Sequence, residues 1–535
     1  MLHNVSYYCS SDKFFQILNC EIRRKPDFRY FIKTESSSVY TISNKEQPGS
    51  LFWLLRQITE AHIYRNGLHT NILNSLVAEI KLYKRRWVVL FLFVFYSGAN
   101  AAQWIQYSII NNIIVKYYGI NDKWVDWTSM IYMIVYIPLI FPGSWFLDKM
   151  GLRITALVGI VGTCIGSWIK VFSVQPDLFY VTFIGQTIVA LAQVCILSLP
   201  ARIAAVWFGP HQVSSACSVG VFGNQLGIAV GFVLPPILVG NSDDLEIIGS
   251  DLLFMFYCFA GFTTILMVLM IFFFRDKPPT PPNPKRSIIP AAGTESEASF
   301  KRSLKNLAIN RNYILLLISY GMNVGVFYAI STLLNPVVLK YYPGHEVDTG
   351  RIGLTIVLAG MIGSVVSGVV LDQMRKFKET TLAVYAFSMV GMWVFTFTLE
   401  TGNIAVVYVT AGLLGFFMTG YLPVGFEFAA ELTYPEPEGT SSGLLNAAAQ
   451  VFGIGFTSLY SELFYSYGDI PADVFMSIML VLGTLITGFI KPDLRRQNAN
   501  RENAAPEFTV SAESVQVQSS DVIIIPTEKL KDIST

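Results

Sequence analysis

The stretch Asn100-Ala-Ala-Gln-Trp-Ile-Gln-Tyr-Ser108 lies in the middle of the first long apolar segment of the chain. No charged side chain occurs between Arg86 and Lys116, and that length is sufficient for a helix that crosses a bilayer. Unpaired polar groups are costly at this depth. The amides and rings of the stretch therefore predict a helix with one side toward a cavity. The alternative is that they only join neighbouring helices and that Trp104 is an interfacial anchor.

The composition predicts an all-α integral membrane protein, because 53% of the 535 residues are hydrophobic and only 14% are charged. A formal net charge of +1 gives no reason to expect a nucleic-acid partner. No Ser/His/Asp set, CxxC, HExxH or phosphate-binding loop is evident, so we expect neither an enzyme nor a metal or cofactor site. The six cysteines lie outside the segments expected to be outer loops, and we expect no disulfides.

Apolar windows of membrane length recur along the chain in two sets of six. They predict twelve transmembrane helices in two bundles, residues 87–274 and 311–490. A Pro-, Ser- and Lys-rich linker, residues 275–310, separates the bundles. Residues 1–86 are predicted to be a tail in which 51–83 could form an amphipathic helix, and residues 491–535 a disordered tail.

Lys and Arg gather at 81–86, 149–153, 275–311, 375–378 and 491–496, whereas the alternate loops carry acidic residues. This asymmetry predicts that both tails and the linker are cytosolic.

The two halves repeat with a nearly constant period. Asp148 and Asp372 are 224 positions apart, and each follows a glycine in a loop of similar sequence that also holds Arg153 or Lys378. The period and the helix count predict two parallel repeats, as in major-facilitator transporters, whose loop signature the first of these loops resembles. An Asp–Arg pair at these helix ends would stabilise one packing of the bundles.

The same period relates Trp104 of the first helix to Tyr328 of the seventh, so we expect the two rings to meet across the cavity. Aromatic faces attract an organic cation by about 0.5 to 2 kcal/mol per ring. Gln193 and Gln450, on the fourth and eleventh helices, could add neutral donors and acceptors or could simply join helices. The first and seventh helices carry no ionisable residue between their ends, which favours uniport without ion coupling.

Charged residues near the ends of paired helices are candidate gates. Arg202 could pair with Glu427, Glu431 or Glu438 on the cytosolic side, while Asp126 and Asn335 could close the outer side; ordinary capping and surface pairing are the alternative. Lys170, near the outer end of the third helix, is expected to extend its ammonium to the interface.

Long strings carry a resemblance to a known family. They are RRWVVL (85–90), QWIQYSIINNI (103–113), SLPARIAAVWFG (198–209), ACSVGVFGNQLGIAVGF (216–232), STLLN (331–335), GRIGLT (350–355), GFFMTGYLPVGFEFA (415–429) and SSGLLN (441–446). Over about residues 85–497 the chain resembles the feline leukaemia virus subgroup C receptor family.

This resemblance implies a major-facilitator fold and transport of choline, with ethanolamine as a further substrate and haem as an alternative one. It also implies that Trp104, Gln193, Tyr328 and Gln450 form the choline site. Asn100 matches a further pocket residue, and the implied gate pairs are Asp126 with Asn335 outside and Arg202 with Glu438 inside. The histidine motifs associated with haem in one branch of the family are absent from this N-terminal tail.

The sequence thus predicts a monomeric alternating-access carrier in the plasma membrane. A mitochondrial or endoplasmic reticulum membrane is the alternative location, and a non-transporting receptor or scaffold is the alternative of another class.

Overall fold

The computed structural model describes residues 21–24, 29–33, 39–43, 83–197, 199–209, 212–279, 297–374 and 376–498. The chain divides into two compact units, of which Glu79–Ala505 is the helical unit and Met1–Ala78 with Pro506–Thr535 is the other. The predicted amphipathic helix at 51–83 lies almost wholly outside the described residues, as does the tail beyond residue 498.

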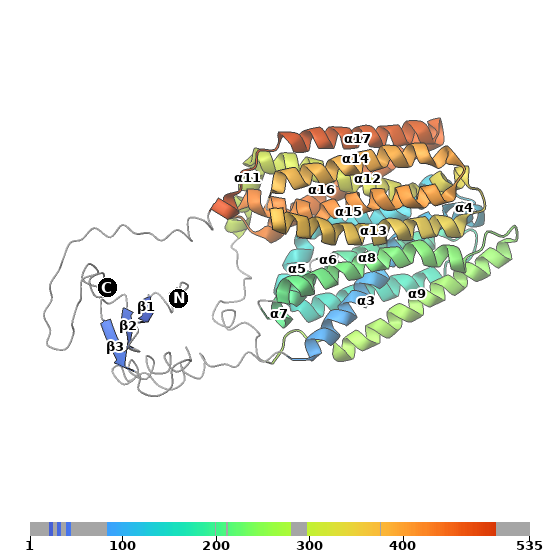
Figure 1. The fold of residues 1–535 in the computed structure, drawn as a ribbon. Coiled ribbons are helices and arrows are strands. Elements are labelled where there is room, and N and C mark those ends of the chain that lie inside the picture. Colours follow the sequence, from blue (N-terminus) through green and yellow to red (C-terminus); the bar gives the residue numbers. More distant parts are fainter. Residues whose placement is uncertain are drawn as a thin grey trace. The chain divides into compact units, whose positions relative to one another are not determined.

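The first half of the helical unit extends to residue 274 (Figure 1). Its helices are α3 (Arg85–Ile105), η2 (Ser108–Ile110), α4 (Asn111–Tyr118), α5 (Asp122–Val171), α6 (Phe179–Leu197), α7 (Leu199–Trp207), α8 (Val213–Leu238) and α9 (Leu245–Phe273).

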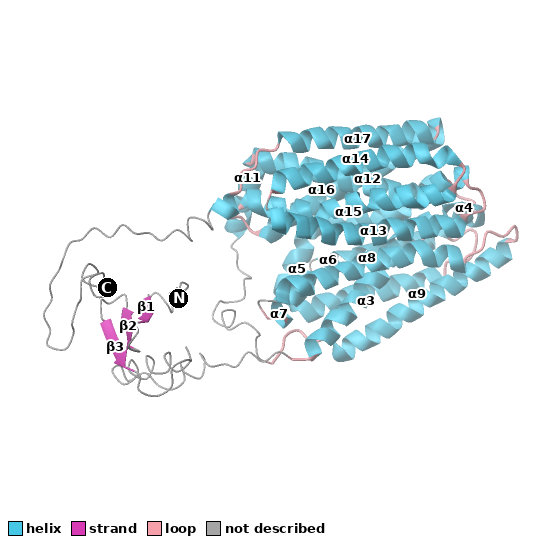
Figure 2. Cartoon of the chain, viewed as in Figure 1, coloured by secondary structure: helices cyan, strands magenta, loops and turns pink. Residues whose placement is uncertain are grey.

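The second half begins after a short helix in the linker, α11 (Glu297–Ile309). It contains α12 (Arg311–Tyr341), α13 (Glu346–Met374), α14 (Phe377–Thr398), η4 (Leu399–Thr401), α15 (Ile404–Thr433), α16 (Glu438–Tyr467) and α17 (Asp469–Phe489). The colouring in Figure 2 shows that this unit is built from helices joined by short loops.

Eleven segments of the described chain are long and apolar enough to cross a membrane. One of them joins α3, η2 and α4, and another joins α6 and α7. Two further ones lie within α5, which turns at Gly151, where φ is 85° and a side chain would be strained. The one predicted span that is missing from these is the eleventh in chain order, which corresponds to α16, a helix of 30 residues. Its polar residues, Gln450 among them, lower its hydropathy.

Arg153, just after the Gly151 turn, is held by the end of α9. Its backbone N–H donates to Asp276 Oδ1 (3.1 Å) and its guanidinium donates to the Ile271 carbonyl (3.0 Å). The side chains of Asp148 and Asp372 lie outside the described part of the chain, so the predicted Asp–Arg pair stays a prediction.

Glycines allow α3 and α8 to pack backbone against backbone. A Cβ atom added to Gly227 would lie 2.2 Å from the Gly98 carbonyl oxygen, and one on Gly223 would lie 2.9 Å from the Val94 Cα. These distances are too short for any side chain. The glycine-rich string at 223–227 is therefore a helix contact, as small residues four positions apart often are in membranes.

Polar side chains fix where several helices begin. The side chains of Asn121, Asp244, Asn310 and Asn403 accept hydrogen bonds from backbone N–H groups in the first turns of α5, α9, α12 and α15.

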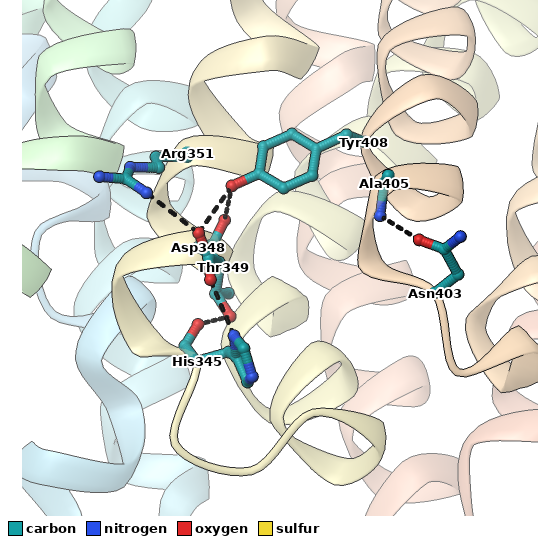
Figure 3. Close-up of polar contacts among 7 residues, drawn as sticks. All are labelled: His345, Asp348, Thr349, Arg351, Asn403, Ala405 and Tyr408. Carbon is teal, nitrogen blue, oxygen red and sulfur yellow. Dashed lines mark hydrogen bonds and ion pairs between the residues drawn. The ribbon is translucent and has the colours of Figure 1, made fainter.

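At the start of α13 the Asp348 carboxylate contacts His345 and Arg351, and Tyr408 of α15 donates to it and to the Asp348 carbonyl (Figure 3). This cluster ties α13 to α15 at one end of the second half.

A small antiparallel sheet in the N-terminal tail was not anticipated from the sequence. It has the strand order β1 (Glu21–Arg24), β2 (Arg29–Lys33) and β3 (Val39–Ser43), with Ile22 opposite Ile32 and Ile32 opposite Tyr40. The β-branched and aromatic residues of these segments favour strands.

Candidate functional site

The first membrane span is interrupted within the stretch that opens the sequence analysis. Helix α3 ends at Ile105, Gln106 and Tyr107 form a turn, and η2 follows before α4 begins. Ile110 has φ −119° and ψ 34°, outside the helical region. A broken helix leaves backbone groups without helical partners, and side chains must satisfy them.

Trp104 and Tyr328 meet across the two halves, as the repeat period predicts. Their ring centroids are 5.5 Å apart, with an interplanar angle of 71°. Trp104 is 5% exposed, and its Nε1–H donates to the Ser129 carbonyl of α5 (3.3 Å).

The sequence analysis predicts that the faces of the two rings oppose each other. In the structure the rings instead meet edge to face. A quaternary ammonium lying over the faces of both rings, within about 6 Å of each centroid, would require the rings to turn.

The three predicted amides differ in what they contact. Gln450 Nε2 donates to the Tyr328 hydroxyl (3.4 Å), so it extends the aromatic pair onto α16. Gln193 on α6 is half-buried and forms no hydrogen bond with the described residues. Asn100 is fully buried and donates both to Thr163 Oγ1 and to the Val189 carbonyl, at 3.1 Å each. Its amide nitrogen thus joins α3 to α5 and α6, while its Oδ1 has no hydrogen-bond partner in the described part of the chain.

Gly453 of α16 supports the Tyr328 ring. A Cβ atom there would lie 2.8 Å from Tyr328 Cδ2 and 2.9 Å from the Met133 sulfur, whereas one on Gly455 would have nothing within 4 Å. The sequence predicts that this ring binds an organic cation. On that hypothesis, Gly453→Ala should displace Tyr328 and raise the half-saturating concentration of the cation in uptake about threefold or more, since a misplaced ring would lose part of its cation–π energy. Uptake at graded substrate concentrations checks this. Gly455→Ala is the matched control, and equal behaviour of the two variants would contradict the prediction.

Hydrogen bonds between the two halves gather at one end of the unit, which we call the closed end. Ser461 of α16 donates to Asp126 Oδ2 (2.6 Å), and Asn335 of α12 donates to the Ile109 carbonyl (2.7 Å). The two predicted gate residues thus each bind the opposite half, although not each other.

Further bonds at the closed end involve residues that the sequence analysis did not select. They are Asn111 with Tyr465, Asn112 and Asn241 with Glu346, Lys123 with Glu462, and Ser129 with Thr332. Five of these nine residues are Asn, Ser or Thr, which occur throughout the sequence, so only the fold distinguishes these.

The opposite end carries the predicted inner gate. The Arg496 guanidinium forms ion pairs with Glu438 Oε1 (3.2 Å) and with Glu427 Oε2 (3.8 Å). The Gln497 N–H donates to Glu431 Oε2 (3.1 Å). Arg202 is half-buried and makes no ion pair with the described residues. In this structure the C-terminal segment, and not Arg202, occupies the acidic end of α15 and α16.

The expectation for Lys170 was wrong. Its side chain does not extend to the interface but is 1% exposed, and Nζ donates to Gln103 Oε1 (3.0 Å) and to Gln186 Oε1. Polar acceptors inside the first half hold the ammonium, and hydropathy alone gives no sign of them.

Of the described residues, no three His, Cys, Asp or Glu side chains form a group that could hold a metal ion. The four described cysteines, Cys164, Cys195, Cys217 and Cys258, are free thiols.

Comparisons with known proteins show the family of the chain. A model of the Major Facilitator Superfamily matches residues 86–458. The chain is 55% identical over 424 residues to the choline/ethanolamine transporter flvcr2b of Danio rerio, covering 79% of this chain and 87% of that protein. It is 53% identical over 426 residues to the choline/ethanolamine transporter FLVCR2 of Homo sapiens, covering 80% and 81%.

Solved structures with the same fold include a bacterial homologue of the human lysosomal transporter Spinster in an inward-facing, unoccupied conformation. Its TM-score is 0.63 at 11% identity, over 78% of this chain and 99% of that one. A D-xylose–proton symporter has a TM-score of 0.60 at 13% identity, over 76% and 98%. At these identities the likeness concerns the fold alone.

Proposed function

The chain belongs to the Major Facilitator Superfamily and, within it, to the family of choline/ethanolamine transporters, and we propose that it carries choline, and also ethanolamine, across a membrane by alternating access. The observation that carries the proposal is the contact of Trp104 with Tyr328 between the two halves. Two adjacent aromatic rings with neutral hydrogen-bonding neighbours suit a quaternary ammonium better than an anion or a sugar.

The neutral surroundings of the pair account for release as well as binding. The groups bonded to the two rings, the Ser129 carbonyl and the Gln450 amide, carry no net charge. A carboxylate would bind the ammonium more strongly but would also retain it. Gln193 and Gln450 orient the hydroxyl end of choline or flank its head group, and Asn100 shapes the pocket floor.

The transport cycle opens the two ends of the unit in turn. When the closed end parts, Asp126 and Asn335 lose their partners on the opposite half, and Arg202 moves toward Glu438 and Glu427 to seal the other end. Both tails and the linker lie in the cytosol in this proposal, so the closed end faces outward, and the carrier resides in the plasma membrane as a monomer.

Choline uptake is expected to be uniport, because the first and seventh spans carry no ionisable side chain between their ends. In proteoliposomes with the membrane potential clamped, labelled choline should move down its own gradient at a rate that a protonophore or removal of sodium does not change. Collapse of the flux under either treatment would refute uniport. Uptake of labelled haem without uptake of choline would instead favour the haem alternative.

Arg202→Glu should shift the population toward the state in which the closed end stays shut, because the sealing ion pair becomes a repulsion. The expected change is about 1 to 2 kcal/mol, or roughly five- to thirtyfold in the population ratio, since the pair is only partly buried. The measurement is the reactivity of Thr332→Cys toward a hydrophilic thiol reagent. Thr332 is 1% exposed and bonds Ser129 across the halves, so a cysteine there reacts only when that end opens.

The charge-matched control for this experiment is Lys305→Glu, which changes an exposed lysine of α11. Reactivity should fall with Arg202→Glu and stay unchanged with Lys305→Glu. Equal reactivity in both backgrounds would remove Arg202 from the gate.

A further inference from the structure

Lys170 is a buried cation whose described contacts are all neutral. It lies one residue before the end of α5, with Nζ bonded to Gln103 Oε1 and Gln186 Oε1 and 5.5 Å from the centroid of the Tyr107 ring. No carboxylate is among these contacts. An ammonium without an acidic partner is costly inside a membrane protein, which suggests a role beyond packing.

The ammonium helps to orient two glutamine amides, together with the Ser167 hydroxyl, which donates to Gln103 Oε1 (3.1 Å), and the Gln106 amide, which donates to Gln186 Oε1 (3.4 Å). Each amide could face either way, but Nζ only donates, so both Oε1 atoms must point toward it. The two Nε2 groups then point away: Gln103 donates to the Ala99 carbonyl (3.2 Å), and Gln186 donates to the carbonyls of Gln103 (2.8 Å) and Thr128 (3.2 Å). If the Gln186 amide turned over, its oxygen would face two carbonyl oxygens.

These two carbonyls flank the Trp104 side of the site. Gln103 precedes Trp104 directly, at the point where α3 ends, and Thr128 precedes Ser129, whose carbonyl accepts from the Trp104 indole. The Gln186 amide therefore bonds both the end of α3, which carries the Trp104 ring, and the segment of α5 to which that ring donates its hydrogen bond. Lys170 holds that amide.

We propose that Lys170 is a positioning residue for the cation site: by orienting Gln186 and Gln103 it fixes the break in the first span that presents Trp104. This inference rests on the proposed function. A quaternary ammonium depends on the ring, whereas a primary ammonium can donate hydrogen bonds to amide oxygens instead. Loss of Lys170 should therefore weaken choline more than ethanolamine.

The test measures half-saturating concentrations and maximal rates of choline and ethanolamine uptake in cells that express the full chain. For Lys170→Met the half-saturating choline concentration should rise about fivefold and that of ethanolamine less than about twofold. The ratio of the two constants does not depend on how much folded protein reaches the surface. Lys116→Met is the matched control, because Lys116 pairs with exposed Asp243 at the same end of the same half; its ratio should stay that of the unaltered chain.

Two results would overturn the inference. If both half-saturating concentrations fall together, Lys170 acts as a fixed charge that repels the substrate. If only the maximal rates fall and the ratio is unchanged, Lys170 serves folding alone. Should Lys170→Met fail to reach the surface, Gln186→Met breaks the same link and must change the ratio in the same direction. Failure of the unaltered chain to take up either substrate would refute the proposed function itself, while normal uptake with an unchanged ratio would refute only the role of Lys170.

Discussion

Trp104→Ala should raise the half-saturating choline concentration about five- to thirtyfold, which corresponds to the loss of about 1 to 2 kcal/mol of cation–π attraction. The indole lies at the interface of the halves and contacts Tyr328, so its removal takes away one of the two rings. Initial rates of labelled choline uptake, normalised to surface protein, measure the effect. Tyr328→Ala should act in the same direction and also remove the hydroxyl that accepts from Gln450.

Conservative replacements separate ring chemistry from bulk. Trp104→Phe keeps a π face and should cost less than Trp104→Ala, whereas Trp104→Leu keeps volume but no quadrupole. If the Leu and Phe variants behave alike, the site is a hydrophobic slot and the cation–π mechanism is wrong. If Trp104→Ala and Tyr328→Ala both leave half-saturation and rate unchanged, neither ring binds choline.

Gly227→Ala should destabilise the folded protein by about 1 to 3 kcal/mol or more, because overpacking a close contact forces the backbone to move. The added methyl group would lie 2.2 Å from the Gly98 oxygen and 2.4 Å from its Cα, and neither atom can rotate away. Helices α3 and α8 must separate to accommodate it. The apparent melting temperature of the purified protein in detergent should therefore drop.

Gly261→Ala in α9 is the control for this substitution. A Cβ atom there would meet nothing within 4 Å, and replacing a helical glycine by alanine otherwise stabilises a helix by roughly 0.5 to 1 kcal/mol. The two variants should thus differ in sign. A melting temperature for Gly227→Ala at or above that of the unaltered chain would show that the α3–α8 contact is not tight in solution.

The repeat made much of this architecture predictable. Once the halves are known to recur every 224 residues, Trp104 and Tyr328 must occupy equivalent places on facing bundles, and the structure brings them together. The period says nothing of ring orientation, which depends on the turn that follows Ile105. The turn at Gln106 and Tyr107 contains no glycine or proline that would mark it in the sequence. It is stabilised by Gln186, which lies 80 positions beyond Gln106 and accepts a hydrogen bond from its amide.

Other differences have an equally local cause. The expected position of Lys170 followed from its place near a helix end, but acceptors on α3 and α6 lie within reach of its ammonium. Arg496, from a segment predicted as tail, pairs with Glu438 in this conformation, while the pairing of Arg202 with Glu438, expected only when the cavity faces outward, stays a prediction. Contacts between distant segments that depend on conformation leave no pattern in one sequence.

The two ends of the unit should also respond differently to ionic strength. At the closed end the bonds of Asp126, Asn335, Ser129 and Thr332 are buried, and three of these four side chains are uncharged. Dissolved ions screen exposed charges over about 8 Å at physiological salt but have little effect on buried hydrogen bonds. The Arg496–Glu438 pair at the other end is exposed enough to be weakened by salt. A change in the electrolyte on the side of the closed end should therefore weaken its exposed Lys123–Glu462 pair but leave its buried hydrogen bonds nearly constant, whereas the same change on the opposite side weakens the ion pair that holds the C-terminal segment.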